Sequence, residues 1–357
     1  MTDPARRLAP VVRLAPAKLN LTLAVVGRRA DGFHNLHSVV VLLDLADRLS
    51  LAVRPSGEDS IHSTGFAVGP AAANLVHAAV VATREAITTT WPGAPAQPPP
   101  LAARLEKRIP VAAGLGGGSS DAAAAIDGAL EAWDAELPPA ARYALAADVG
   151  SDVPLFLAGG AALIEGRGER VTPLHGVRCA DGEEPAVLLV TPAVAAHTGT
   201  VFDAWSGGAM SEPGVARRTS EHFASEFGSG LAVRQLVERA AVLAAANDLL
   251  PAAAAVVPGL VQLRRGLARL LARPIGMTGS GPTLWCLYPS RGEADEAAAA
   301  VTAALDTGSI SAPGDGPPFV TATTIRAGDR PDRTGAGSGG PATQHEPSIP
   351  IPERSVR

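Results

Sequence analysis

The chain has 357 residues, of which 46% are hydrophobic and 18% charged, so it can bury the core of one large or two medium domains. The formal net charge of −5 and the lack of a basic stretch interleaved with aromatic residues argue against a nucleic-acid partner. Two widely spaced cysteines, no signal-peptide core and no membrane-spanning apolar run predict a cytoplasmic protein without a membrane partner.

The first half of the chain predicts alternating strands and helices after a flexible N-terminus at 1–10. In order, its pattern predicts a strand pair broken at Pro16 (11–27), two strands (37–53), a helix that Asn74 could cap (72–87), a proline-rich loop (92–100), a strand (101–109), a helix to about Trp133, a helix at 136–150, and then a loop with a short strand pair.

A composition shift near 178–184 predicts a domain boundary, with domains at 11–178 and 179–326. The second domain is expected to contain a strand at 186–192, a short helix from 199, weak signals at 207–230, helices at 231–245 and 257–272, a strand–turn–strand at 274–289, a helix at 292–306 and a strand at 318–326. The tail at 327–357 is rich in Gly, Pro and Ser and is predicted to be disordered.

The stretch Pro110–Ile126, PVAAGLGGGSSDAAAAI, contains a glycine loop followed by an alanine-rich helix start. Ser119 or Ser120 is the expected N-cap, because serine oxygens accept hydrogen bonds from first-turn amides. Since a strand precedes the loop, backbone N–H groups and the helix dipole should converge on a phosphate. No lysine follows the last glycine, and Ser119 replaces the third glycine of a dinucleotide fingerprint, so neither of those common motifs is matched.

The order of Pro110, Gly-Leu-Gly and Ser-Ser resembles the phosphate loop of the GHMP kinases, and GLGGGSSDAA is similar to one branch, the 4-diphosphocytidyl-2-C-methyl-erythritol kinases of non-mevalonate isoprenoid synthesis. The resemblance covers about residues 11–326. It implies an α+β, two-domain GHMP kinase fold, with a ribosomal S5 domain 2-like N-terminal domain and a ferredoxin-like C-terminal domain. The residues it implies for ATP are Asn74, Lys107, Pro110, Gly114, Leu115, Gly116, Gly117, Gly118, Ser119 and Ser120.

Two blocks carry the chemistry that this resemblance implies. Lys18 lies in APAKLNL, where the family's lysine stabilises charge on the transferred phosphoryl group, and Asp152 lies in GSDVP, where the family's aspartate accepts the proton of the acceptor hydroxyl. Lys18 and Lys107 are the only lysines of the sequence, and both fall on family positions. We expect Asp152 to precede a strand. The plain structural alternatives are that Asp152 is a capping or turn aspartate and that Lys18 is a surface lysine.

The acceptor is expected to bind at segments far apart in the sequence. RADGFHNL is similar to the block that grips cytosine, with Phe33 in place of the usual tyrosine. The residues that the resemblance implies for the acceptor are Asn20, Phe33, His34, Asp152, Thr198, Phe202, Gly279, Ser280 and Gly281. The Asn-Asp-Leu element at 247–249 also matches, but no contact is assigned to it.

The resemblance therefore implies ATP- and Mg²⁺-dependent phosphorylation of the 2-hydroxyl of a cytidylated methyl-erythritol, by a monomer or a homodimer whose Mg²⁺ ligands are not identified. One alternative is another GHMP kinase acting on homoserine, mevalonate or a sugar. A second is a nucleotide-binding relative without catalysis, against which the intact Lys18 and Asp152 argue.

Overall fold

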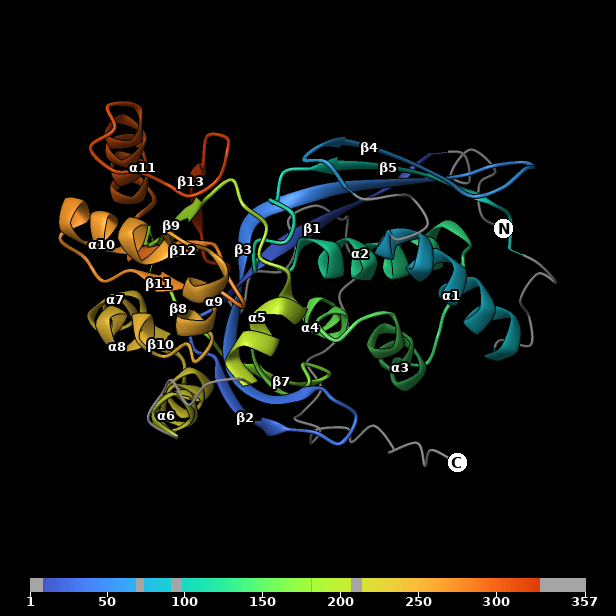
Figure 1. The fold of residues 1–357 in the computed structure, drawn as a ribbon. Helices are drawn as coiled ribbons and strands as arrows, with labels where there is room; N and C mark the ends of the chain where they lie inside the picture. The colour runs from blue at the N-terminus through green and yellow to red at the C-terminus, as the bar shows by residue number, and fades with distance from the viewer. Residues whose placement is uncertain (1–8, 69–73, 91–97, 181, 207–213, 328–357) are drawn as a thin grey trace.

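Two main β-sheets organise the molecule, one from residues before Gly176 and one from residues after Pro185 (Figure 1). The computed structural model describes residues 9–68, 74–90, 98–180, 182–206 and 214–327. The larger sheet has seven strands: β1 (Val11–Asn20), β2 (Ala24–Arg28), β3 (His34–Val53), β4 (Ser60–Gly65), β5 (Leu101–Lys107), β6 (Ala161–Gly166) and β7 (Arg170–Leu174). The smaller has four: β9 (Ala186–Thr191), β11 (Gly276–Met277), β12 (Leu284–Tyr288) and β13 (Phe319–Thr324).

Helices cover both sheets and connect them. They are α1 (Leu75–Thr90), α2 (Gly117–Ala132), α3 (Pro139–Val149), α4 (Val153–Ala158), α5 (Thr198–Ser206), α6 (Val215–Ser229), α7 (Val233–Glu238), α8 (Ala240–Ala244), α9 (Leu250–Val256), α10 (Leu260–Leu271) and α11 (Arg291–Asp306). Helix α2 packs on β1 and β3 and beside α1, whereas α11 packs on the small sheet. A short parallel pair, β8 (Val177–Arg178) with β10 (Leu231–Ala232), completes the fold. The predicted α+β class is confirmed.

Strand β3 is one continuous strand of 20 residues, so the prediction of two strands at 37–53 was wrong. Asp47, inside this run, does not interrupt the strand, because it is fully buried and accepts hydrogen bonds from the backbone at Arg108 and Ile109. β3 pairs with β1, β2, β5 and β6, and its middle also bridges to Ile325 beyond the small sheet. In Figure 1 this long strand bends near the centre of the molecule, with the small sheet on the other side of the bend.

The first strand pair breaks later than predicted. β1 continues through Pro16 with only a shift of register before Lys18, and the interruption falls between Asn20 and Ala24. A proline is tolerated at such a bulge because the ladder hydrogen bond is already missing there.

Several local predictions in the second half were also incomplete. The helix expected at 231–245 is divided into α7 and α8, and α6 fills the stretch of weak signals as far as the structure describes it. The helix predicted at 257–272 is α10, which begins at Leu260, and a separate helix of seven residues, α9, precedes it. Parts of the proposed flexible N-terminus, the proline-rich loop and the tail from residue 328 lie outside the described residues. The domain boundary near 178 stays a prediction.

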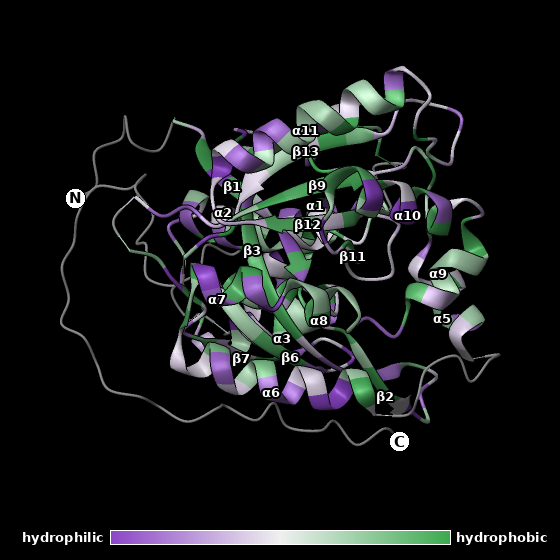
Figure 2. Cartoon of the chain, turned by 90° about the vertical axis from the view of Figure 1, so that its left-hand side faces the viewer, coloured by the Kyte–Doolittle hydropathy of each residue, from purple (hydrophilic) through white to green (hydrophobic). Residues whose placement is uncertain are grey.

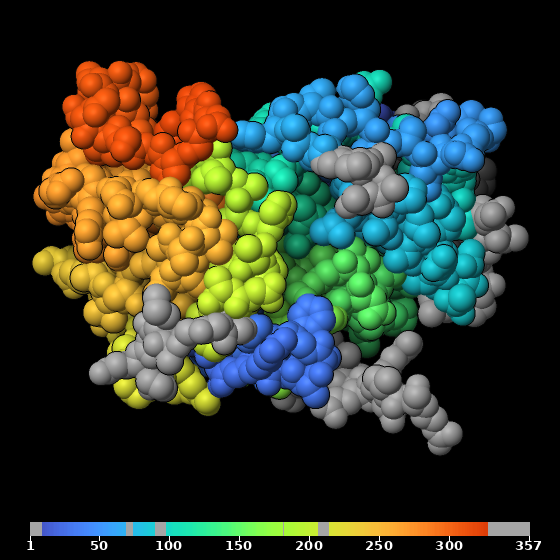
Figure 3. Space-filling model, in the orientation of Figure 1, coloured from blue at the N-terminus to red at the C-terminus, as the bar shows by residue number. Residues whose placement is uncertain are grey.

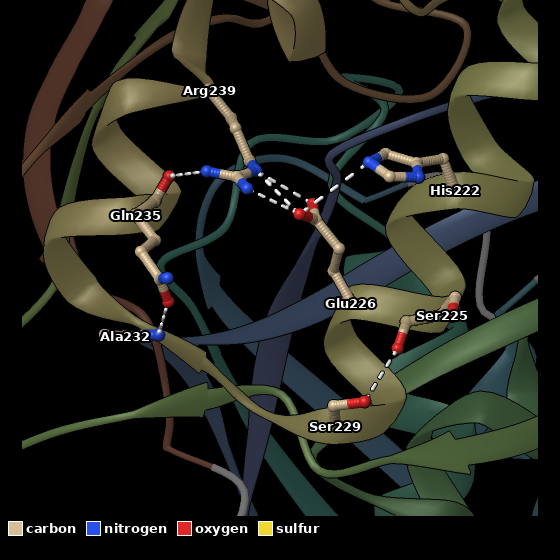
Figure 4. A network of polar contacts seen from close by, with 7 residues as sticks. All are labelled: His222, Ser225, Glu226, Ser229, Ala232, Gln235 and Arg239. Atoms are coloured by element: carbon tan, nitrogen blue, oxygen red, sulfur yellow. Dashed lines mark hydrogen bonds and ion pairs between the residues drawn. The ribbon is translucent and has the colours of Figure 1, made fainter.

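A polar network joins α6 to α7 on the outer face (Figure 4). The Arg239 guanidinium donates to both carboxylate oxygens of Glu226, with N–O distances of 2.5–3.0 Å, and His222 Nε2 lies 3.7 Å from the same carboxylate. In Figure 2, hydrophilic residues alternate with hydrophobic ones along α6 and α7, whereas the strands of the small sheet are mostly hydrophobic. The inner face of α6 buries Phe223 and Phe227 in the core.

Candidate active site

The glycine loop lies between β5 and α2, as predicted, but the helix begins earlier than expected. Gly116 is the N-cap, with a left-handed φ of 72°, and α2 starts at Gly117. Ser119 and Ser120 therefore lie in the first turn, and the prediction that either one caps the helix was wrong. Because the first amides of a helix have no intrahelical partner, the loop still offers N–H donors and a helix dipole to an anion.

Gly116 faces the predicted catalytic lysine at close range. A Cβ built there would lie 2.8 Å from Lys18 Cγ and 2.9 Å from Phe156 Cζ, so only glycine fits this position. The Lys18 backbone N–H donates to the Leu115 carbonyl at 2.9 Å. These contacts attach the glycine loop to β1 and bring Lys18 directly beneath it.

Lys18 is 5% exposed, and its Nζ donates to Asn20 Oδ1. Burial lowers the pKa of the Lys18 ammonium, and the negative charge of Asp152 acts in the opposite direction. The structure thus places Lys18 in contact with Asn20 and within electrostatic range of Asp152. A charged lysine here depends on the carboxylate beside it.

Asp152 caps a helix, so the predicted strand after it was wrong. It is the N-cap residue of α4, whose first turn contains Pro154, and proline is well suited to that turn because no amide is needed there. The Asp152 side chain makes no capping hydrogen bond to the helix and is partly exposed. Its carboxylate is therefore not consumed by the capping role that the sequence offered as an alternative.

The loop between β11 and β12 closes over the glycine loop. A Cβ built at Gly279 would lie 3.1 Å from Lys18 Nζ, and Thr278 Oγ1 donates to the Gly114 carbonyl at 3.2 Å. Thr198 Oγ1 lies 3.2 Å from Ser280 Oγ, which joins two of the predicted acceptor segments.

Sequence reasoning assigned no role to Asn247, yet its Nδ2 donates to the carbonyls of Met277 and Gly279 at 2.9 and 3.0 Å. Asn247 is buried and thereby fixes the backbone of the β11–β12 loop. The match of the Asn-Asp-Leu element was the available signal, but a backbone contact 30 residues away is not visible in the sequence.

Lys107 forms a buried cluster beneath the loop with Asp47 and Asp121. Its Nζ donates to Asp47 Oδ2 and, at 2.6 Å, to Asp121 Oδ2. The other Asp47 oxygen accepts from the backbone N–H groups of Arg108 and Ile109 at 2.5 and 2.9 Å. Burial and the Asp47 charge raise the pKa of Asp121, while Lys107 lowers it. Because Lys107 and the backbone that follows it precede the glycine loop and Asp121 follows the loop, this cluster fixes both ends of the loop. The expected contact of Lys107 with the nucleotide stays a prediction.

Of the predicted cytosine-binding residues, His34 and Phe202 are in contact. The His34 ring stacks on Phe202 with centroids 4.9 Å apart and planes at 18°, and Trp205 meets His34 edge-on at 5.4 Å. Burial is the main cause that lowers the pKa of His34. Phe33 is 49% exposed, with the Arg167 guanidinium 5.5 Å from its ring centroid. Figure 3 shows the blue N-terminal segment beside the yellow-green one that carries α5.

Asn74 caps α1, as predicted, and its Oδ1 accepts from the Val76 N–H at 3.0 Å.

Ser120 lies on the face of α2 that borders a cavity of about 460 Å³. Neither Lys18 nor Asp152 lines this cavity. The buried Ser120 hydroxyl has no hydrogen-bond partner among the described residues. Ser119 is partly exposed at the loop, so its hydroxyl is the more accessible of the two.

Within the described part of the chain, no group of three or more His, Cys, Asp and Glu side chains is placed to hold a metal ion. A search of the same residues finds no helix with the length and apolarity needed to cross a bilayer.

Comparison with known proteins identifies relatives over most of the chain. Family models described as the GHMP kinases N terminal domain and the GHMP kinases C terminal match residues 74–160 and 231–307. The 4-diphosphocytidyl-2-C-methyl-D-erythritol kinase of Pelotomaculum thermopropionicum is 35% identical over 81% of this chain and 93% of its own length, and that of Cereibacter sphaeroides is 39% identical over 82% and 93%.

Solved structures show the same relationship. A crystal structure of 4-(cytidine 5'-diphospho)-2C-methyl-D-erythritol kinase superposes with a TM-score of 0.61 at 32% identity, over 88% of this chain and 98% of that one. Homoserine kinase from Cytophaga hutchinsonii superposes with a TM-score of 0.63 over 89% and 96%, but at 16% identity this likeness concerns the fold alone.

Proposed function

Because the chain belongs to the GHMP kinases, and among them to the 4-diphosphocytidyl-2-C-methyl-D-erythritol kinases, we propose that it transfers the γ-phosphate of ATP to the 2-hydroxyl of that cytidylated acceptor, with Asp152 as base and Lys18 as electrostatic stabiliser. The observation that carries the assignment of roles is the position of Lys18. Lys18 is buried beneath the glycine loop, and the negative charge of Asp152 raises the pKa of its ammonium against the effect of burial.

The phosphates of ATP would bind at the glycine loop. The residues proposed for the nucleotide are the loop members Pro110, Gly114, Leu115, Gly116, Gly117, Gly118, Ser119 and Ser120, together with Asn74 and Lys107. The amides at the start of α2 supply donors that need no rearrangement when an anion arrives. Phosphoryl transfer depends mainly on such positioning and on neutralising charge.

The acceptor would lie between Asp152 and the aromatic residues His34 and Phe202. A cytosine ring is flat and apolar on its faces, and the exposed Phe33 ring and the Phe202 ring are suited to stacking. The His34 ring nitrogens would meet the polar edge of cytosine. Asn20, Thr198, Gly279, Ser280 and Gly281 are proposed to complete the acceptor site.

In the chemical step, Asp152 would accept the proton of the 2-hydroxyl. The oxygen of that hydroxyl would form a bond to the γ-phosphorus of ATP, and the bond between this phosphorus and the β,γ-bridging oxygen would break, which releases ADP. Lys18 would stabilise the negative charge that this transfer places on the phosphoryl oxygens. Since Lys18 is shielded from water, its charge acts more strongly than it would in solvent.

We also propose Mg²⁺ as cofactor. The partly exposed Ser119 hydroxyl fits the oxygen-donor chemistry of this ion, which typically takes few protein ligands and several phosphate oxygens and waters. When bound, Mg²⁺ neutralises charge on the phosphates. The cytoplasmic location and the choice between monomer and homodimer stay predictions.

The deciding experiment is ATP turnover by the purified protein with 4-diphosphocytidyl-2-C-methyl-D-erythritol, compared with homoserine, mevalonate and galactose. We expect turnover only with the cytidylated acceptor, and its loss in Asp152→Asn. Turnover with another acceptor would discard the cytosine site, and no turnover with any acceptor would contradict the kinase assignment.

A further inference from the structure

A chain of buried hydrogen bonds runs from Lys18 into the interior between β1 and β3. Lys18 Nζ donates to Asn20 Oδ1, Asn20 Nδ2 donates to Ser38 Oγ at 2.8 Å, and the Ser38 hydroxyl donates to the Thr22 carbonyl. Ser38 is 0% exposed and Asn20 is 3% exposed, so bulk water does not replace any of these bonds.

The donors and acceptors in this chain fix which way the Asn20 amide points. The single proton of Ser38 is committed to the Thr22 carbonyl, so Ser38 Oγ can only accept a hydrogen bond from Asn20. The Asn20 NH₂ group must then face Ser38, and Oδ1 must face Lys18.

This orientation matters because of what a neutral Lys18 could do. An ammonium has three donors and no acceptor, whereas a neutral amine can accept a hydrogen bond. An Asn20 amide that was free to turn over could present its NH₂ group to the amine and stabilise the uncharged form. With Ser38 in place, Lys18 meets an acceptor in either protonation state, which favours the charged form.

We propose that Ser38 is a positioning residue that holds the Asn20 amide oxygen towards Lys18 and thereby keeps Lys18 charged and in place for phosphoryl transfer. The relevance to catalysis depends on the proposed function of Lys18. The charged group that acts on Lys18 from the start of α4 is Asp152, while Gly116 and Gly279 approach it without charge. In the contacts described above, Asn20 is the only group proposed to bind ATP or the acceptor that Ser38 touches.

The test uses the fact that the sequence has only two lysines. Protein labelled with ¹³C at the lysine ε-carbon should give two signals, which Lys107→Arg assigns, and the pH titration of the Lys18 signal needs no substrate. In Ser38→Ala we expect the Lys18 midpoint at lower pH than in the wild type, and kcat reduced about 10- to 100-fold with little change in the KM for ATP. Ser50→Ala, at the far end of the same strand, is the matched control and should leave both unchanged.

A double mutant separates orientation from simple loss of packing. Asn20→Asp presents only acceptor oxygens at neutral pH, so adding Ser38→Ala to it should shift the Lys18 midpoint less than Ser38→Ala does alone. If Ser38→Ala does not fold, Ser38→Cys is the second variant. It has a side chain of similar shape whose sulfur is a poor acceptor, so the same lowering of the Lys18 midpoint is expected.

An unchanged Lys18 midpoint in folded Ser38→Ala or Ser38→Cys would overturn the proposal, as would an equal shift in the Asn20→Asp background. A wild-type protein that fails to phosphorylate the acceptor would instead count against the proposed function. The substrate-free titration would still decide whether Ser38 controls Lys18.

Discussion

Gly114 and Gly279 come into backbone contact, because a Cβ built at Gly279 would lie 2.9 Å from the Gly114 carbonyl oxygen. One residue belongs to the glycine loop and the other to the loop between β11 and β12. The two loops can approach this closely because neither residue has a side chain.

We expect Gly279→Ala to lower kcat about 10-fold or more, because the new methyl group also meets Lys18 Nζ at 3.1 Å. The left-handed φ of Gly279, 58°, adds a backbone penalty of about 1–2 kcal/mol to the free energy of folding. Steady-state kinetics and denaturant unfolding measure the two effects. Gly308→Ala is the matched control: φ is 68° but no atom lies within 4 Å of the new Cβ, so it should cost stability without affecting kcat. Equal kcat values in both variants would contradict the proposed contact.

Asp152→Asn should lower kcat at least 100-fold, because it removes the proposed base. It should also lower the pKa of Lys18 further, because burial already lowers that pKa and the Asp152 charge opposes the effect. As the pH is raised, the residual activity of the variant should therefore begin to fall at a lower pH than the activity of the wild type. The pH dependence of kcat measures this shift. Asp148→Asn removes an exposed carboxylate on α3 and should change neither value.

Asp47→Asn should lower the free energy of unfolding by about 1–3 kcal/mol, because it weakens the buried charge-assisted hydrogen bonds of Asp47, although Lys107 keeps Asp121 as its partner. It should also weaken ATP binding, since Asp47 holds the amides of Arg108 and Ile109 at the start of the glycine loop. Denaturant unfolding and calorimetric titration with ATP test the two expectations. Asp44→Asn, at an exposed carboxylate paired with Arg326, should cost less than about 1 kcal/mol and leave ATP affinity unaltered.

Stability should decrease in mild acid because of His37. Burial is the main cause that lowers its pKa, and Nδ1 lies 2.8 Å from Ser220 Oγ. The unfolded chain binds a proton near pH 6.5, whereas the folded chain binds it only at lower pH. The contribution is therefore complete above pH 6.5 and is lost as the pH falls through the lower, folded-state pKa. Unfolding midpoints at pH 7.5 and 5.5 should differ less in His37→Gln than in the wild type, whereas the exposed His62→Gln should behave like the wild type.

The sequence was sufficient to predict the α+β class and the glycine loop between a strand and a helix, because the family resemblance is carried by short, dense motifs. The roles of Lys18 and Asp152 come from the same motifs and stay predictions. The start of α2 was misplaced because serine is the usual cap, while the crowding of Gly116 against Lys18 and Phe156 arises only in three dimensions. The contacts of Ser38 with Asn20 and of Asn247 with Gly279 join separate strands and loops, so no local pattern could indicate them.

The length of β3 has a consequence for synthesis of the chain. Its middle bridges to Ile325, and Leu23, just before β2, bridges to Asn247, so the first strands contact segments that lie much later in the chain. A growing chain can form the glycine loop early, but Gly279 and Ile325 leave the ribosome hundreds of residues after Lys18. The loop between β11 and β12, which closes over the glycine loop, is therefore made long after the glycine loop itself, and a product terminated before residue 276 would lack it.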